Sequence, residues 1–215
     1  LEMYTGRDIA PGLFAWVIPN GETHRIGMWA LPDDLDGHSC EEFVDNLMNH
    51  PLWRHKFENC RETARYCGPI PAGMVRRPYG ERVLLVGDAA GLAKPTTGGG
   101  IGPGFQQVDL LSEGISSAIS QDALSARKMK KICRPLEQMR REQQRSRALR
   151  DFFVTSRSDA ELHQHFEIFA KPEVIELINY QGDIERPASL GLALLKEVPE
   201  FRKIALKAGF AMMFG

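Results

Sequence analysis

The stretch that decides the fold is Arg82-Val83-Leu84-Leu85-Val86-Gly87-Asp88-Ala89-Ala90-Gly91, followed after two residues by Lys94-Pro95-Thr96-Thr97-Gly98-Gly99-Gly100-Ile101. The apolar run 83–86 predicts a buried strand whose carboxyl end carries Asp88. Pro103 suits the first turn of a helix, and apolar residues spaced by three and four predict that helix over 104–119. Its predicted inward face is made of Phe105, Val108, Leu111, Ile115 and Ile119.

This strand, Gly-rich loop and helix start could hold a ligand. Glycines allow backbone N–H groups to approach a bound molecule closely, and a helix start favours negative charge. An Asp at a strand end accepts hydrogen bonds from hydroxyl groups, so a flavin with its ribityl chain fits. A structural Gly-rich loop after a core strand is the alternative. A phosphate loop is disfavoured because Lys94 precedes the glycines and no G-x₄-G-K-[ST] motif is present.

Upstream of this stretch, the pattern predicts antiparallel strands over residues 5–31. The run 13–18 is β-rich, Asn20-Gly21 is a turn signal, and alternating apolar residues follow over 23–31. Ser39 and Glu42 form a capping box that predicts a helix, and Pro51 stops it. The Pro- and Gly-rich segment 61–80 predicts irregular chain.

Downstream of residue 121 the pattern is helical only. The predicted helices cover 122–134, 135–155, 159–168, 172–180 and 197–213, with breaks at Pro135 and Pro187. The chain is therefore expected to be α+β, in three parts. Residues 1–80 belong to a sheet domain, 81–121 hold the strand, loop and helix, and 122–215 form a helical domain.

Composition excludes several classes of protein. With 215 residues, 43% of them hydrophobic, and a net charge of −1, the chain has enough apolar surface to fold. The longest apolar run, 13–18, is far shorter than the ~20 residues of a membrane span. The charge balance points to no nucleic-acid partner. Four cysteines without C-x₂-C spacing predict reduced intracellular thiols, with a Cys60–Cys67 disulfide left as the alternative.

Two segments resemble the geranylgeranyl reductase family of FAD-dependent enzymes, which have a p-hydroxybenzoate-hydroxylase-like fold. Gly87-Asp88-Ala89-Ala90-Gly91, the Pro seven residues after the Asp, and Gly98-Gly99-Gly100-Ile101 resemble its second flavin-binding motif. The segment 11–19 resembles its substrate-domain motif P-x-x-Y-x-W-x-F-P, with Phe14 in place of Tyr and Ile18 in place of Phe. The phenol of that Tyr, and any role it has, is therefore absent here.

The resemblance implies an FAD site. Asp88 would bind the ribityl or adjacent phosphate region, and 98–101 would line the pyrimidine edge of the flavin. The N–H groups there would stabilise negative charge at N1/O2 of reduced flavin. The implied cofactor-binding residues are Gly87, Asp88, Pro95, Gly98, Gly99, Gly100 and Ile101.

The family's dinucleotide motif, G-x-G-x-x-G after a strand, is not found in this sequence. We therefore interpret the chain as the C-terminal half of a longer enzyme, and expect it to bind FAD weakly or not at all alone. The implied partners are an isoprenoid lipid substrate, an N-terminal half, and ferredoxin or NAD(P)H as electron donor. The expected location is cytoplasmic, with peripheral membrane contact as an extension.

Three functions remain open. The first is a flavin-dependent reductase that saturates isoprenoid double bonds in lipid or pigment precursors. The second is an aromatic monooxygenase of the same fold, which is disfavoured because those enzymes carry His where this chain has Gly91. The third is a non-catalytic fragment or interaction domain. No catalytic residue and no proton donor can be assigned from the sequence.

Other features have competing interpretations. Phe14 and Trp16 point to one side of a strand and either bind a prenyl chain or pack in the core. The pair His163 and His165 predicts surface histidines rather than a metal site. Segment 127–150 holds ten Lys/Arg and two Glu, so it is either a solvated helix face or a docking face for an acidic electron donor or anionic lipid headgroups. The apolar segment 204–214 predicts packing, with membrane contact as the alternative.

Overall fold

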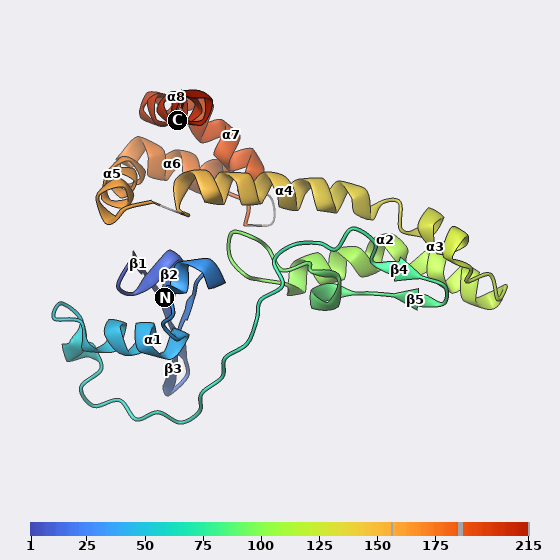
Figure 1. Ribbon diagram of the computed structural model, residues 1–215, viewed down its shortest axis with the longest axis horizontal. Helices are drawn as coiled ribbons and strands as arrows, with labels where there is room; N and C mark the ends of the chain where they lie inside the picture. The colour runs from blue at the N-terminus through green and yellow to red at the C-terminus, as the bar shows by residue number, and fades with distance from the viewer. Residues whose placement is uncertain (156, 185–186, 215) are drawn as a thin grey trace. The chain divides into compact units, whose positions relative to one another are not determined.

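The computed structural model describes residues 1–155, 157–184 and 187–214, and it confirms an α+β chain with small antiparallel sheets (Figure 1). Contacts divide it into two compact units. Unit 1 contains 1–68 and 151–171, and unit 2 contains 69–150 and 172–215. The predicted functional division into 1–80, 81–121 and 122–215 stays a prediction.

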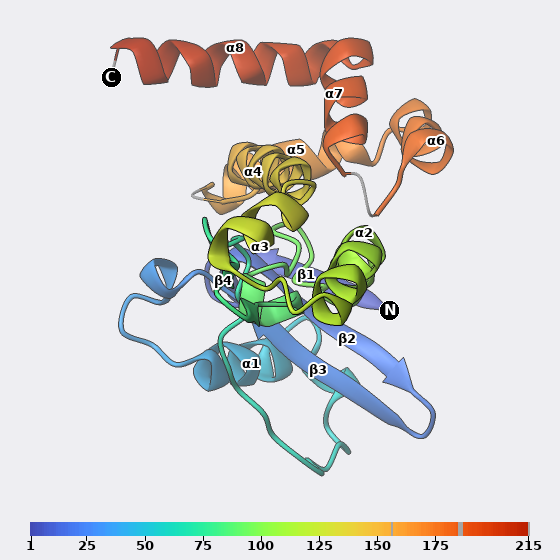
Figure 2. The ribbon, with the colours of Figure 1, turned by 90° about the vertical axis from the view of Figure 1, so that its right-hand side faces the viewer.

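Unit 1 is built on a three-stranded antiparallel sheet in the order β1-β2-β3. The strands are β1 (Glu2–Gly6), β2 (Ala10–Asn20) and β3 (Thr23–Trp29). Asn20 pairs with Thr23 across a two-residue turn, and Gly21 in that turn has φ 64°. The predicted strands and hairpin are confirmed, and Figure 2 shows β2 and β3 as one long hairpin.

One face of this sheet forms a core with α1 (Cys40–Asn49). The predicted capping box is present: Ser39 accepts a hydrogen bond from the N–H of Glu42, whose carboxylate accepts one from the N–H of Ser39. Helix α1 ends at Asn49, two residues before Pro51. The buried residues of this core are Tyr4, Ile9, Ala10, Ala15 and Leu47.

Unit 1 also contains two 3₁₀ turns and a segment from the second half of the chain. The turns are η1 (Pro32–Leu35) and η2 (Arg54–Lys56). The later segment is the end of α4 (Leu136–Phe153) and all of α5 (Asp159–Phe169). The carboxylate of Asp159 accepts a hydrogen bond from the N–H of Arg7 at 3.0 Å, which ties α5 to the β1–β2 turn.

In unit 2 the predicted strand 83–86 is shorter and more exposed than expected. Only β5 (Val83–Leu84) is paired, and its partner is the two-residue β4 (Tyr79–Gly80). Val83 and Val86 are 51% and 42% exposed, so the prediction of a buried strand was wrong. The reason is that β5 has one short neighbour within the described residues, which leaves its other edge uncovered.

The predicted helix is confirmed as α2 (Ile101–Ser120), but its predicted inward face was wrong in part. Phe105, Val108 and Ile119 are exposed, by 68%, 48% and 61%. The helix is apolar on two sides, and contacts with neighbouring elements decide which side is buried. The buried residues of α2 are Pro103, Gln107, Leu111 and Ala118.

The rest of unit 2 is helical, as predicted. It contains α3 (Ala126–Ile132), α4 up to Arg150, α6 (Pro172–Gln181), α7 (Pro187–Glu197) and α8 (Pro199–Phe214). Helix α7 was missed, because Pro187 was interpreted as a break and the structure has it as the first helical residue, where proline needs no N–H partner. The side chains of 207–214 lie outside the described part, so the prediction for 204–214 is not addressed. The core of unit 2 consists of Ala90, Leu92, Leu111, Cys133, Leu136 and Met139.

All four cysteines are free thiols, so the Cys60–Cys67 alternative is wrong in this structure. Cys60 and Cys67 are exposed, whereas Cys133 is buried, and burial raises the pKa of the Cys133 thiol. In the described part of the chain, no helix combines the length and the apolarity that a bilayer crossing requires.

Candidate flavin loop and aromatic face

The Gly-rich loop begins with a sharp bend after β5. Residues Gly87–Ala90 form the 3₁₀ turn η3, which ends at Gly91 with φ 74°. A Cβ at Gly91 would lie 2.2 Å from the carbonyl oxygen of Gly73, so only glycine fits this close backbone approach. The turn is closed by hydrogen bonds from the N–H of Gly91 to the carbonyl of Asp88 (2.8 Å) and from the N–H of Leu92 to that of Gly87 (3.2 Å).

A buried glutamine fixes this bend to α2. The side chain of Gln107 is fully buried. Its Oε1 accepts a hydrogen bond from the N–H of Gly87 at 2.9 Å, and its Nε2 donates to the carbonyl of Leu85 at 2.9 Å. These two bonds satisfy backbone groups on either side of Val86, which no strand pairs. Gln107 therefore sets the position of η3 over the start of α2.

The start of α2 presents unpaired donors. In the described structure the N–H groups of Gly100, Ile101 and Gly102 have no hydrogen-bond acceptor, and Pro103 has no N–H to contribute. The exposed carboxylate of Asp88 lies beside them: a Cβ at Gly100 would be 2.6 Å from Asp88 Oδ1. The loop thus brings one carboxylate and a cluster of backbone donors to a single place.

Side chains of α4 hold the other side of the loop. Arg150, which is buried, donates from Nη1 to the carbonyl of Pro95 at 3.1 Å. Gln143 donates from Nε2 to the carbonyls of Gly91 and Ala93 at 3.3 and 3.2 Å, and its Oε1 accepts from the N–H of Met74. The loop is therefore anchored along its length rather than freely flexible, which argues against a merely permissive Gly-rich linker.

This arrangement fits the group that the sequence implied. A polar edge with a developing negative charge would find the N–H donors and the dipole of a 20-residue helix. A hydroxyl-bearing chain would find the carboxylate of Asp88. One further group points to a ligand: Thr96 Oγ1 is buried and has no hydrogen-bond partner within the described residues.

The structure brings the predicted cofactor-binding residues together. Gly87 and Asp88 lie at the η3 turn, Pro95 is buried against Arg150, and 98–101 lead into α2. Whether they bind FAD stays a prediction. The sequence analysis missed Gln107, although a glutamine four residues before Leu111 on an apolar helix is a detectable signal for a buried polar bridge.

Phe14 and Trp16 lie in unit 1, on the sheet face opposite the α1 core. Their ring centroids are 5.9 Å apart, and Trp29 joins them at 6.0 Å from Phe14. The Trp16 ring covers Gly27, where a Cβ would lie 2.7 Å from it. Phe14 and Trp16 are half-buried, whereas Leu13 and Ala15 of the other face are fully buried. Trp16 is therefore not a residue of the α1 core.

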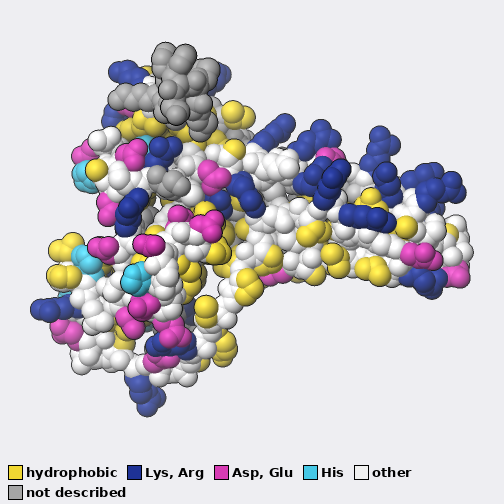
Figure 3. Space-filling model, viewed as in Figure 1, with side chains coloured by type: hydrophobic (Ala, Val, Ile, Leu, Met, Phe, Trp, Pro, Cys, Tyr) yellow, Lys and Arg dark blue, Asp and Glu magenta, His cyan; other side chains and the backbone are white. Residues whose placement is uncertain are grey.

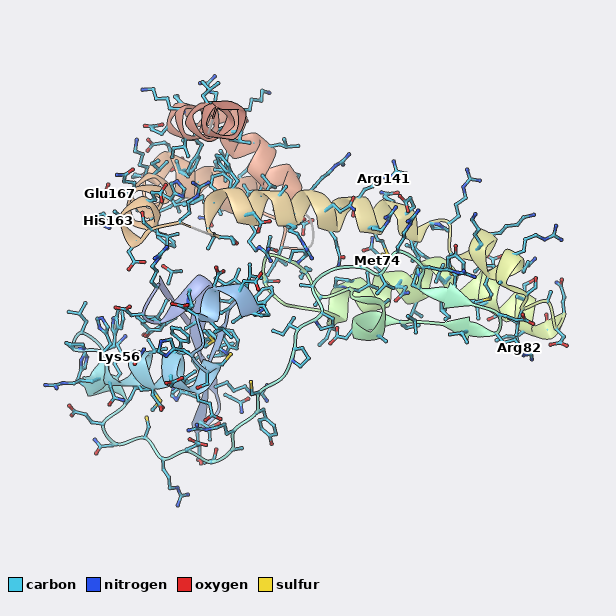
Figure 4. The ribbon with its side chains drawn as sticks, viewed as in Figure 1. Lys56, Met74, Arg82, Arg141, His163 and Glu167 are labelled. Carbon is cyan, nitrogen blue, oxygen red and sulfur yellow. The ribbon has the colours of Figure 1, made fainter. Side chains whose placement is uncertain are left out.

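The two histidines differ from the prediction. His163 is exposed, and its Nε2 lies 3.4 Å from the carboxylate of Glu167. Figure 4 labels both residues on α5. His165 is buried, so its assignment to the surface was wrong: its Nδ1 donates to the carbonyl of Phe153 at 2.9 Å, where α4 ends. No cluster of His, Cys, Asp or Glu in the described ranges could hold a metal ion.

Comparison with known proteins gives a consistent set of relatives. No family model matches the sequence. An uncharacterised protein of Methanocaldococcus jannaschii is 28% identical over 198 residues, which is 91% of this chain and 49% of that protein. A digeranylgeranylglycerophospholipid reductase of Methanopyrus kandleri is 30% identical over 177 residues, 81% of this chain and 44% of that protein.

A solved structure is similar in fold. The geranylgeranyl bacteriochlorophyll reductase-like protein of Thermoplasma acidophilum aligns with a TM-score of 0.73 at 23% identity, covering 94% of this chain and 48% of that one. The chain thus spans about half the length of the curated relatives it matches. The predicted resemblance to the geranylgeranyl reductase family is therefore confirmed, because several of these relatives are named digeranylgeranylglycerophospholipid reductase.

Proposed function

We propose that this chain is part of an FAD-dependent reductase that saturates isoprenoid double bonds in a lipid or pigment precursor. The observation that carries the proposal is the site at the start of α2. There the carboxylate of Asp88 lies beside unpaired backbone N–H groups of 100–102. The names of the relatives, which describe reductases of geranylgeranylated phospholipids, support the substrate class.

The residues of the loop would hold the flavin in defined ways. Asp88 would accept hydrogen bonds from the ribityl or adjacent region, and the backbone of 98–101 would lie along the pyrimidine edge. When bound and reduced, the flavin supplies the hydride for the double bond. The protein's own contribution is the positive end of α2, whose N–H donors favour negative charge on that edge. Gln107 and Arg150 keep this loop in place.

The aromatic face of unit 1 would hold the prenyl chain. A prenyl chain offers no hydrogen bonds, so its site must be apolar and partly aromatic, as the face of Phe14, Trp16 and Trp29 is. Truncation of Trp16 to Ala in the complete enzyme should weaken binding of a long isoprenoid far more than of a short one. Equal losses for both lengths, with a stability loss of about 3–5 kcal/mol, would assign Trp16 to packing alone.

An aromatic monooxygenase of the same fold is the second candidate, and the structure disfavours it. The residue that carries His in those enzymes is Gly91 here. The left-handed backbone of Gly91 and its approach to Gly73 leave no room for a side chain. A histidine could not be accommodated without moving the segment 72–74. The reductase is therefore the better proposal, and a non-catalytic role would be indicated by failure of the flavin test below.

The test is flavin retention by the complete protein that contains this chain. We expect purified protein to show flavin absorbance, and Asp88→Ala to lose affinity by roughly ten- to a hundred-fold, since a hydrogen bond to a charged group contributes about 1.5–3 kcal/mol. Asp109→Ala is the matched control, because Asp109 is an exposed carboxylate on α2 that lies beyond its first turn. Unchanged flavin content in Asp88→Ala would contradict the assignment. Absence of flavin from the unmodified protein would contradict the reductase proposal and favour a non-catalytic role.

A further inference from the structure

A pocket of about 520 Å³ lies in unit 2, away from the Gly-rich loop. It is formed by the segment 74–79 on one side and by α3 and the first turns of α4 on the other. None of the residues 87–101 lines it. Figure 4 shows Met74 beneath α4, whereas Arg141 points to solvent from the other side of the helix.

The lining of this pocket, here called the basic pocket, is strongly cationic. It carries one carboxylate, Glu137, against six cations: Arg76, Arg127, Lys130, Lys131, Arg134 and Arg140. Of these cations, only Arg140 forms an ion pair within the described part of the chain, with Glu137. The whole chain has a net charge of −1, so this excess is local. Figure 3 shows Lys and Arg side chains gathered along α3 and the adjoining part of α4.

The positions of these cations lower the stability of the folded chain when no anion is bound. Helix α3 has seven residues, and Arg127 lies three and four residues before Lys130 and Lys131, where like charges repel. Arg127 also lies in the first turn, where the helix dipole disfavours a positive charge. Exposed helix positions tolerate neutral or acidic residues equally well. A bound anion would offset this repulsion. Anion binding would therefore explain why so many cations lie together here.

The floor of the basic pocket is apolar. Leu136 and Cys133 are buried in the core of unit 2, and Met74 and Tyr79 pack against it. A cavity of this size suits a small ligand, whose pockets span roughly 300–1,000 Å³. A folded acidic protein would instead need about 800 Å² of matching surface. Cations at the rim over an apolar floor match a molecule that joins an anionic group to an apolar part.

We propose that the basic pocket binds a phosphate ester that carries an apolar substituent. Arginine forks pair with phosphate oxygens in two parallel hydrogen bonds, and lysines add point charges. The apolar part of the ligand lies on Met74 and Tyr79. A lipid headgroup and a soluble phosphate ester share this chemistry, and binding measurements separate them. The inference goes beyond the flavin and reductase proposal, because the two sites share no residue.

The test compares two double variants of the full chain with equal change in charge. Lys130→Glu with Arg134→Glu reverses two exposed cations of the pocket. Lys128→Glu with Arg145→Glu reverses two cations of α3 and α4 that do not line it. The probes are hexyl phosphate, a soluble ester with an apolar chain, in titration calorimetry, and vesicles of phosphatidylcholine with or without phosphatidylglycerol in co-sedimentation. Thermal melts confirm that both variants are folded.

We expect the pocket variant to weaken binding at least tenfold, and the control variant to change it less than threefold. Loss of vesicle binding alone assigns the pocket to a lipid headgroup, and loss of hexyl phosphate binding alone assigns it to a soluble ester. The proposal is overturned if the unmodified chain binds neither probe, or if both variants lose binding equally, which would indicate diffuse attraction. A pocket variant that no longer folds is replaced by Lys130→Gln with Arg134→Gln, judged by the same limits.

Discussion

Gln107 is the residue whose replacement tests the geometry of the loop most directly. Its fully buried amide bridges the N–H of Gly87 and the carbonyl of Leu85, each at 2.9 Å. Gln107→Leu keeps the bulk and removes both bonds. A buried backbone group left without a partner costs about 1–3 kcal/mol. Because Leu85 and Gly87 are only half-buried, we expect the lower part of that range for each, or about 2–3 kcal/mol in total.

The assay is urea unfolding followed by far-ultraviolet circular dichroism. All three tryptophans lie in unit 1, so tryptophan fluorescence would not report on α2. With a slope of about 2–3 kcal/mol per molar, the midpoint should fall by about 1 M. Gln106→Leu is the matched control, since Gln106 is exposed on the same helix, and its midpoint should hardly move. A Gln107→Leu midpoint equal to that of the control would refute the bridging role.

A second variant gives the same prediction a pH dependence. In Gln107→Glu a protonated carboxyl can still donate to Leu85 and accept from Gly87, whereas the carboxylate can only accept. Burial should raise the pKa of this carboxyl in the folded state above its unfolded value. Stability is then retained below the unfolded pKa and lost as pH rises through the folded pKa. The variant should therefore be closer to wild type at about pH 4.5 than at about pH 8.

Two further predictions follow from the close approach of Gly91 to Gly73 and from the different exposure of Cys60 and Cys133. Gly91→Ala should destabilise the chain by at least about 2 kcal/mol, because the new Cβ would meet the carbonyl of Gly73. Gly87→Ala is the control: a Cβ there meets open space, so the variant should cost only the backbone strain of about 1–2 kcal/mol. Equal shifts in melting temperature for the two variants would contradict the contact with Gly73. Exposed Cys60 should react with a thiol reagent in the folded chain, and Cys133, buried and with a raised pKa, only after unfolding. Rapid modification of Cys133 without loss of helix would show that its burial is wrong.

Much of the local structure could be predicted because its causes lie within a few residues. The turn at Asn20-Gly21 and the capping box of Ser39 and Glu42 need no distant partner, and both are present. The same holds for the Gly-rich loop before α2, whose left-handed glycines include Gly91 and Gly98. Alternation along β2 likewise placed Phe14 and Trp16 on one face.

Only the tertiary structure decided which of these surfaces are covered. Helix α2 carries apolar residues on two sides, and its contact with Gly87 and α3 selects the side of Gln107 and Leu111. Burial of His165 depends on the carbonyl of Phe153, twelve residues earlier, which needs a donor where α4 ends. The basic pocket joins 74–79 to residues in the distant segment 127–140. Local propensity acts over one or two turns of chain, whereas burial depends on which distant segment is packed against a residue, and a single sequence does not specify that segment.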